Sequence, residues 1–138
     1  MERRPKFDLE RLVEAASVDA FMLGGSRCLV ILLQYLPDHL TCRRFVQELV
    51  ALLSQGDFCN TKMLEDRKGD AEDFDEYGIE ASTELLDQYG MEEVCWYIKF
   101  TIRKGDWGDE VFFISVHPLE KPIERVDGWL SPKRRLHS

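Results

Sequence analysis

The sequence predicts an α+β fold in which N-terminal helices pack on a small antiparallel sheet. In the first third of the chain, apolar residues recur at three- and four-residue spacing, the pattern of helices with one buried face. Between residues 94 and 117, apolar and polar residues alternate instead, which is typical of strands with one face in a core. The chain has 138 residues, of which 44% are hydrophobic. This length suits one core, so we expect a single domain over residues 1–138.

Helices are expected where a polar residue that can cap a helix precedes an apolar periodic run. The expected helices, each with its capping residue, are 9–16 (Asp8), 27–36 (Ser26), 42–54 (Thr41) and 82–88 (Ser82 or Thr83). Pro37 separates the second helix from the third, and Gly90 ends the last. The third helix carries the clearest apolar stripe, so we expect it to cover the sheet.

Strands are expected in the second half of the chain. The expected order is a strand over 57–64, mostly loop over 65–80, strands over 94–103 and 111–117 joined by a turn over 104–110, and an extended C-terminal tail over 118–138. The last two strands form a hairpin because their connection is short and contains two glycines. Pro118 ends the second of them.

The register of this hairpin follows from placing apolar residues opposite each other. The expected pairs are Ile98 with Val116, Phe100 with Ile114, Ile102 with Phe112, Tyr97 with His117, and Lys99 with Ser115. The other face of the hairpin then carries polar side chains. Its members are Tyr97, Lys99, Thr101, Arg103, Ser115 and His117.

This polar face has the groups that RNA cleavage by transesterification needs. A base removes the proton of the 2′-hydroxyl, an acid protonates the leaving 5′-oxygen, and cations stabilise the charged phosphorane. His117 can act as acid or base near neutral pH. Lys99 and Arg103 can hold phosphate, and Tyr97 can stack on a base or donate a proton. The competing interpretation is a solvated face, which any half-buried antiparallel hairpin has.

The net charge of −8 comes from one segment. Residues 65–93 hold 12 acidic and 2 basic side chains, whereas residues 94–138 hold 6 acidic and 8 basic ones. Such a segment repels RNA, and we hypothesise that it folds over the sheet and masks it. A second interpretation is a calcium loop, because Asp73, Asp75 and Glu84 occupy three of the ligand positions, although Tyr77 stands where an oxygen ligand belongs.

Other site types are not supported by the sequence. The four cysteines are widely spaced in apolar contexts, so we expect buried free thiols and no metal. His39 and Cys42 form half of a metal motif without a second half. The chain shows neither a signal peptide nor an apolar run long enough for a membrane helix, so we expect a cytoplasmic protein that does not contact a membrane.

The order of these features resembles the motility quorum-sensing regulator (MqsR-type) toxins over residues 7–120. The resemblance lies in an N-terminal Phe-x-Leu-x-x-Leu-Val helix, then Asp-Phe-Cys-Asn-Thr-Lys-Met at residues 57–63, Tyr-Ile-Lys-Phe at 97–100, and Ile-Ser-Val-His-Pro at 114–118. Those toxins are small RelE-like mRNA interferases that a cognate antitoxin neutralises. The resemblance implies a RelE-like fold, a toxin–antitoxin endoribonuclease without cofactor, and RNA and an antitoxin as partners.

The resemblance also implies site residues. The family's catalytic tyrosine matches Tyr97, and its late lysine falls on His117. Its first lysine falls on Asn60, with Lys62 as the nearest cation on the same strand face. The expected catalytic residues are Tyr97, His117 and Lys62, and the expected substrate-binding residues are Lys99, Arg103, Asn60 and Ser115. Because one catalytic lysine is missing, a non-catalytic protein-interaction module on the same scaffold is the alternative.

Overall fold

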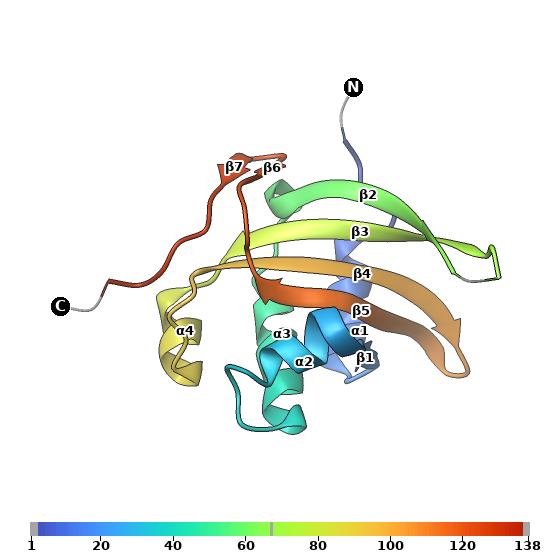
Figure 1. The fold of residues 1–138 in the computed structure, drawn as a ribbon. Coiled ribbons are helices and arrows are strands. Elements are labelled where there is room, and N and C mark those ends of the chain that lie inside the picture. Colours follow the sequence, from blue (N-terminus) through green and yellow to red (C-terminus); the bar gives the residue numbers. More distant parts are fainter. Residues whose placement is uncertain (1–2, 67, 137–138) are drawn as a thin grey trace.

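The computed structural model of the protein describes residues 3–66 and 68–136. Arg67 of the acidic segment and the last two residues of the expected tail therefore lie outside the described residues. Within these ranges four α-helices accompany a five-stranded sheet (Figure 1), which confirms the α+β prediction. The helices are α1 (Leu9–Ser17), α2 (Val30–Leu32), α3 (His39–Ala51) and α4 (Thr83–Tyr89). The strands of the sheet are β1 (Phe21–Leu23), β2 (Phe58–Glu65), β3 (Ala71–Glu80), β4 (Cys95–Gly105) and β5 (Gly108–Pro118).

The sheet has the strand order β1-β5-β4-β3-β2. Each of β2 to β5 is antiparallel to its neighbours in this series, which agrees with the antiparallel sheet that the sequence predicts. The edge strand β1 was not predicted, and it pairs with β5 in parallel. It is three residues long, too short to show an alternating pattern, and Phe21 fixes it by packing its ring edge against Phe113 at 5.6 Å between centroids.

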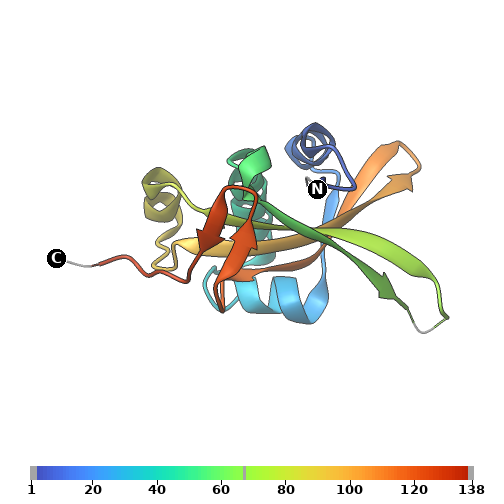
Figure 2. The same ribbon diagram turned by 90° about the horizontal axis from the view of Figure 1, so that it is seen from above.

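One face of the sheet is covered by α1, α3 and α4, as Figure 2 shows. Trp96 and Phe100 of β4 point into this core, and the ring of Phe45 from α3 lies 4.9 Å from that of Trp96. α3 begins at His39 rather than Cys42 because Asp38, not Thr41, is its N-cap and accepts from the Thr41 N–H at 2.7 Å. Among the described residues, no helix has the length and apolar character that crossing a membrane requires.

The segment predicted as one helix over 27–36 is a π-helical turn, η1 (Gly25–Leu29), followed by the single turn of α2. The reason lies at Gly24, whose N–H donates to the Phe113 carbonyl at 2.8 Å. A Cβ at Gly24 would stand 2.9 Å from that carbonyl oxygen, so only glycine lets the chain approach β5 so closely. The helical turn consequently begins against the edge of β5 and brings Arg27 to the far side of the sheet.

The prediction of a loop over residues 65–80 is wrong, because most of these residues form β3. Its many carboxylates favoured a loop in the sequence pattern, but in the structure they have partners inside the fold. Asp75 is fully buried and accepts from the backbone N–H groups of Lys6 and Phe7 and from the Thr61 hydroxyl. Fixed donors therefore satisfy this carboxyl group inside the fold.

The same strand rules out the calcium loop. Asp73 and Asp75 lie in extended backbone, about 7 Å apart along the strand. Asp73 pairs with Lys6, while Glu84 lies in α4. Within residues 3–66 and 68–136, no group of three or more histidine, cysteine, aspartate or glutamate side chains could hold a metal ion.

The C-terminal region is not simply an extended tail. Strands β6 (Ile123–Arg125) and β7 (Gly128–Leu130) form a hairpin, which we call the C-terminal hairpin. In Figure 1 the chain leaves β5, crosses in front of β4 and β3, and reaches this hairpin beside β2. Leu130 is buried, whereas Trp129 is 67% exposed. Further along, Lys133 and Arg135 pair with Glu80 and Asp87.

Candidate functional site

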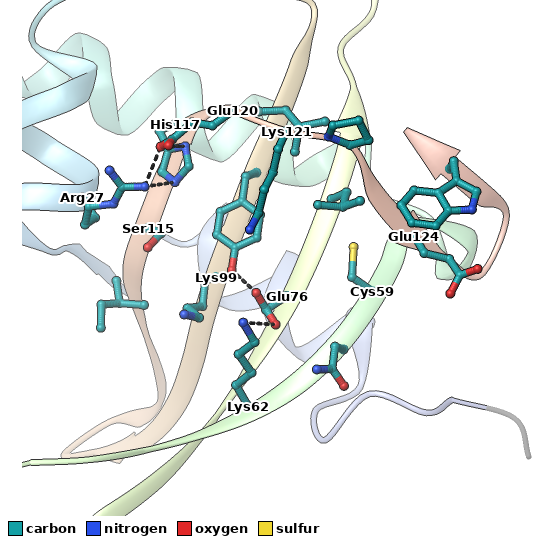
Figure 3. A pocket seen from close by; sticks show the side chains of 17 residues that line it. Arg27, Cys59, Lys62, Glu76, Lys99, Ser115, His117, Glu120, Lys121 and Glu124 are labelled. Carbon is teal, nitrogen blue, oxygen red and sulfur yellow. Dashed lines mark hydrogen bonds and ion pairs between the residues drawn. The ribbon is translucent and has the colours of Figure 1, made fainter. Parts of the chain in front are cut away.

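A cavity of about 720 Å³ lies on the sheet face that α1, α3 and α4 leave open. We call it the open-face cavity. Its floor comes from β2 to β5, one wall comes from η1, and the other comes from residues 119–124 with Trp129. Figure 3 shows Arg27, His117 and Glu120 at one end, Lys62, Lys99 and Glu76 in the middle, and Glu124 at the opposite end.

The hairpin register is confirmed at the cavity and wrong beyond it. Tyr97 pairs with His117, Ile98 with Val116 and Lys99 with Ser115, as predicted. A β-bulge after Lys99 then shifts the register by one residue. The shifted pairs are Phe100 with Phe113, Thr101 with Phe112, and Ile102 with Val111. Pattern matching assumed uninterrupted pairing, which a bulge breaks while it leaves both strands in place.

Six of the seven predicted site residues line the open-face cavity. They are Asn60, Lys62, Tyr97, Lys99, Ser115 and His117. The seventh, Arg103, lies outside it. Its guanidinium donates to both carboxylate oxygens of Glu72, at 2.8 and 2.7 Å, and lies 4.7 Å from the Phe112 ring centroid. Arg103 is therefore bound within the protein and does not face the other six.

His117 is a buried imidazole with a defined tautomer. Its side chain has three polar contacts: Nδ1 lies 2.8 Å from the Pro118 carbonyl and 3.4 Å from Glu120 Oε1, and Nε2 lies 3.1 Å from Arg27 Nη2. A carbonyl only accepts and a guanidinium only donates, so Nδ1 carries the proton and the lone pair of Nε2 accepts from Arg27. Burial lowers the pKa of His117, and the charges of Arg27 and Lys99 lower it further against the Pro118 hydrogen bond. The ring is therefore neutral at neutral pH.

Tyr97 and Glu76 form a hydrogen-bonded pair on the cavity floor. The Tyr97 hydroxyl donates to one Glu76 oxygen, and the Lys62 ammonium lies 3.7 Å from the other. Burial, and then the hydrogen bond to Glu76, raise the pKa of Tyr97 above its usual value, so the hydroxyl keeps its proton. The Tyr97 ring lies 5.1 Å from the His117 ring, which limits how that imidazole can turn.

Two cavity lysines have no ion pair with any described residue, namely Lys99 and Lys121. The other charges of the cavity are paired. The pairs are Arg27 with Glu120 at 2.6 Å, Lys62 with Glu76 at 3.7 Å, and Glu124 with Arg3 at 4.0 Å. Burial lowers the pKa of Lys99, as do Lys62 and Arg27, while Glu76 opposes them. Four lining cations face three lining carboxylates, so the cavity suits an anion despite the net charge of the chain.

Sequence reasoning missed Arg27, Glu76 and Glu120. Glu76 was assigned to a loop. The signal in favour of a strand was the presence of three apolar residues inside the acidic run, Phe74, Tyr77 and Ile79, which are buried in the structure. Arg27 reaches the site only through the unusual turn after Gly24, for which the sequence has no pattern. Cys59 also lines the cavity, but burial raises the pKa of its thiol to about 11, so it is not a thiolate nucleophile.

The masking hypothesis is wrong for the described part of the acidic segment. That segment does not fold over the sheet, since it contributes β3, an inner strand of the sheet. Its carboxylates are paired with cations from the rest of the chain. The pairs include Asp73 with Lys6, Glu72 with Arg103, Glu80 with Lys133 and Asp87 with Arg135. Deleting residues 66–90 would therefore remove a strand rather than uncover a site.

Comparison with known proteins gives no relative: no family model, no curated protein and no solved structure matches this chain. The resemblance to MqsR-type toxins consequently stays a prediction, which these comparisons neither support nor refute. The site must be interpreted from its own geometry.

Proposed function

We propose that the protein is a cytoplasmic, RelE-like, metal-independent endoribonuclease that cleaves RNA by transesterification in the open-face cavity. One observation carries the proposal. A neutral imidazole whose unprotonated Nε2 contacts only the half-exposed Arg27, His117, and an ammonium without an ion pair to a described residue, Lys99, lie on adjacent strands in diagonal positions. Such positions are about 7–8 Å apart, which leaves room for a phosphodiester between the two side chains.

In this proposal His117 is the base and Lys99 the acid. The Arg27 guanidinium turns from His117 to a phosphate oxygen, and Nε2 of His117 then takes the proton of the 2′-hydroxyl while the 2′-oxygen attacks phosphorus. The bond from phosphorus to the 5′-oxygen breaks, and that oxygen takes a proton from the Lys99 ammonium, whose lowered pKa favours the transfer. The products are a 2′,3′-cyclic phosphate and a free 5′-hydroxyl. The two residues regain their starting protonation by exchange with water.

The neighbouring residues have supporting roles. Arg27 contacts His117 with one nitrogen and is half-exposed, so its remaining N–H groups can reach a phosphate oxygen. Lys62 adds positive charge beside the same position. Tyr97 orients His117 through ring contact, and its hydroxyl is directed to Glu76. Asn60 and Ser115 provide polar atoms on the floor.

The alternative is a protein-interaction module on the same scaffold. Two contacts favour it, because each gives a candidate catalytic group a partner within the protein. They are the Tyr97 hydroxyl with Glu76 and the His117 Nε2 with Arg27. On this alternative the contacts are structural, and the cavity binds a partner without cleaving it. The toxin interpretation differs in a second way, since it requires a cognate antitoxin and growth arrest when the protein is produced without one.

The test is a cleavage assay with a labelled oligoribonucleotide in the presence of EDTA. We expect fragments that end in a 2′,3′-cyclic phosphate, and no cleavage where the 2′-hydroxyl is replaced by hydrogen. The variant His117→Ala should be inactive while its fold, checked by circular dichroism, is kept. Intact RNA after incubation with folded wild-type protein would overturn the nuclease proposal and leave the interaction module.

A further inference from the structure

We infer that Trp129 forms a stacking platform for an unpaired base, so that the open-face cavity takes single-stranded rather than double-stranded RNA. This inference rests on the proposed function and extends it to the class of substrate. Trp129 lies on β7, outside the segment that carries the resemblance, and lines the cavity together with the two lysines that have no ion pair.

The C-terminal hairpin that carries Trp129 is firmly attached. It packs on Gly78 of β3, where a Cβ would stand 2.4 Å from Ile123 Cδ1, so a larger residue would displace that side chain. Arg125 donates to Asp57 at 2.8 Å, and both side chains are largely buried. The backbone N–H groups of Val126 and Asp127 donate to the Phe58 and Gly56 carbonyls. The wall is therefore a fixed part of the site, not a loose tail.

Trp129 remains exposed on this fixed support. Its side chain is 67% exposed although the residue after it, Leu130, is buried. An indole held in contact with water at the rim of a cavity presents a flat apolar face at little cost in conformational entropy. A nucleobase covers such a face well, and stacking accepts every base.

The charges beside Trp129 identify the ligand as a nucleic acid strand. Lys121 and Lys99 line the same cavity without ion pairs among the described residues, so they can bind the phosphates that flank a stacked base. Glu124, which lies opposite Trp129 in the C-terminal hairpin, has a cation partner of its own in Arg3 at 4.0 Å. In a duplex both faces of each base are covered by its neighbours, so only an unpaired base can reach the indole.

Another exposed tryptophan provides a matched control. Trp107, in the turn between β4 and β5, is 99% exposed and lines none of the cavities described for residues 3–66 and 68–136. Trp96, the third, is fully buried in the core. Because leucine keeps apolar bulk but cannot stack, Trp129→Leu and Trp107→Leu test the position rather than the loss of an indole.

The experiment is a titration with a fluorescein-labelled single-stranded oligonucleotide of about 8 residues that is 2′-O-methylated and so cannot be cleaved. The anisotropy of the label gives the affinity, and an unlabelled copy is used to read tryptophan emission. We expect base stacking to quench tryptophan emission in wild type and in Trp107→Leu, and to leave Trp129→Leu unquenched. The affinity of Trp129→Leu should fall by about 5- to 150-fold, the range measured for single stacked bases. Trp107→Leu should bind like wild type, and a duplex of the same sequence should bind wild type at least tenfold more weakly.

The outcomes separate this inference from the proposed function. If Lys99→Met weakens binding while the two tryptophan variants bind alike, the strand binds in the cavity and the stacking platform is overturned. Equal binding of duplex and single strand also overturns it. If wild type binds no oligonucleotide, both the inference and the proposed function fail.

Discussion

The two ends of the open sheet face carry similar side chains but use them differently. At the inner end, around Tyr97 and His117, Lys99 has no ion pair with a described residue and faces a cavity. At the outer end, Arg103 binds Glu72 through two hydrogen bonds and covers the Phe112 ring. Both cations belong to β4 and are four residues apart on the same face.

The difference lies in the neighbouring strand. The residue opposite Lys99 on β3 is Glu76, but Lys62 and Tyr97 already bind that carboxylate. No other described cation pairs with Glu72, and both of its carboxylate oxygens accept from Arg103. Lys99 is thus available to a ligand because other groups already bind the carboxylate opposite it. Arg103 is not available, because its neighbouring carboxylate binds Arg103 itself.

The largest expected effect concerns the base at the inner end. Replacing His117 with alanine should reduce RNA cleavage by about 10²- to 10⁴-fold, the usual contribution of a positioned general base. The matched change at the outer end, Arg103→Ala, should leave the rate within about threefold, because Arg103 contacts only the protein. Single-turnover cleavage of a labelled oligoribonucleotide measures both. Equal losses in the two variants would mean that the ends do not differ in function.

The next effect is the pH dependence of cleavage, which tests whether His117 and Lys99 are the two titrating groups. The lowered pKa of His117 means that kcat/KM should rise tenfold per pH unit in acid and level off below the ordinary histidine value of 6.5. It should fall again in alkali, at a pH below the ordinary lysine value of 10.5, as Lys99 loses its proton. In Lys99→Met the alkaline limb should vanish. A rate that decreases as the pH rises through 6, or an alkaline limb that persists in Lys99→Met, would contradict this pair of catalytic groups.

A smaller effect concerns binding of RNA by charge. Because Lys99 is free to contact phosphate, Lys99→Met should reduce the slope of log affinity against log salt by about 0.7 for a single strand. Arg103→Met should leave that slope unchanged, since its charge is already neutralised by Glu72. Fluorescence titration of the uncleavable oligonucleotide between low and physiological salt gives both slopes. Two equal slopes would contradict the distinction between a free and a paired cation.

The smallest effect is on stability, and here the two ends should differ in sign. Arg103→Met removes a half-exposed ion pair and should lower the free energy of unfolding by up to about 1 kcal/mol. Lys99→Met removes a partly buried charge that Lys62 and Arg27 repel, and should raise the free energy of unfolding by about 0.5 kcal/mol. Urea denaturation at pH 7 measures both. A loss of stability in Lys99→Met would indicate a structural role for Lys99.

Much of this arrangement was predictable from local pattern. The alternation around Tyr97 indicated which side chains share a face, and placing apolar residues opposite each other predicted the pairing of Tyr97 with His117. α4 with its Ser82 cap and Gly90 stop, and the four buried free cysteines, were confirmed for the same reason, since each depends on a few adjacent residues.

The rest depends on contacts between distant segments. Asp75 is buried because the backbone of Lys6 and Phe7 meets it, some 68 residues away in sequence, so no local rule identifies β3. Arg27 enters the site through a close backbone approach at Gly24. The wall that carries Trp129 depends on Gly78 accepting Ile123. Sequence thus indicated the floor of the cavity, while its walls follow from tertiary packing.

The most direct test of the difference between the two ends is a ¹H–¹⁵N NMR titration with the uncleavable single strand. We expect chemical-shift changes to concentrate at the inner end, on the amides of Lys99, Ser115 and His117 and on the Trp129 indole N–H, with Arg103 and Trp107 unmoved. Changes centred on Arg103 and Phe112, or none at saturating oligonucleotide, would contradict the account of the open-face cavity as the site of RNA binding.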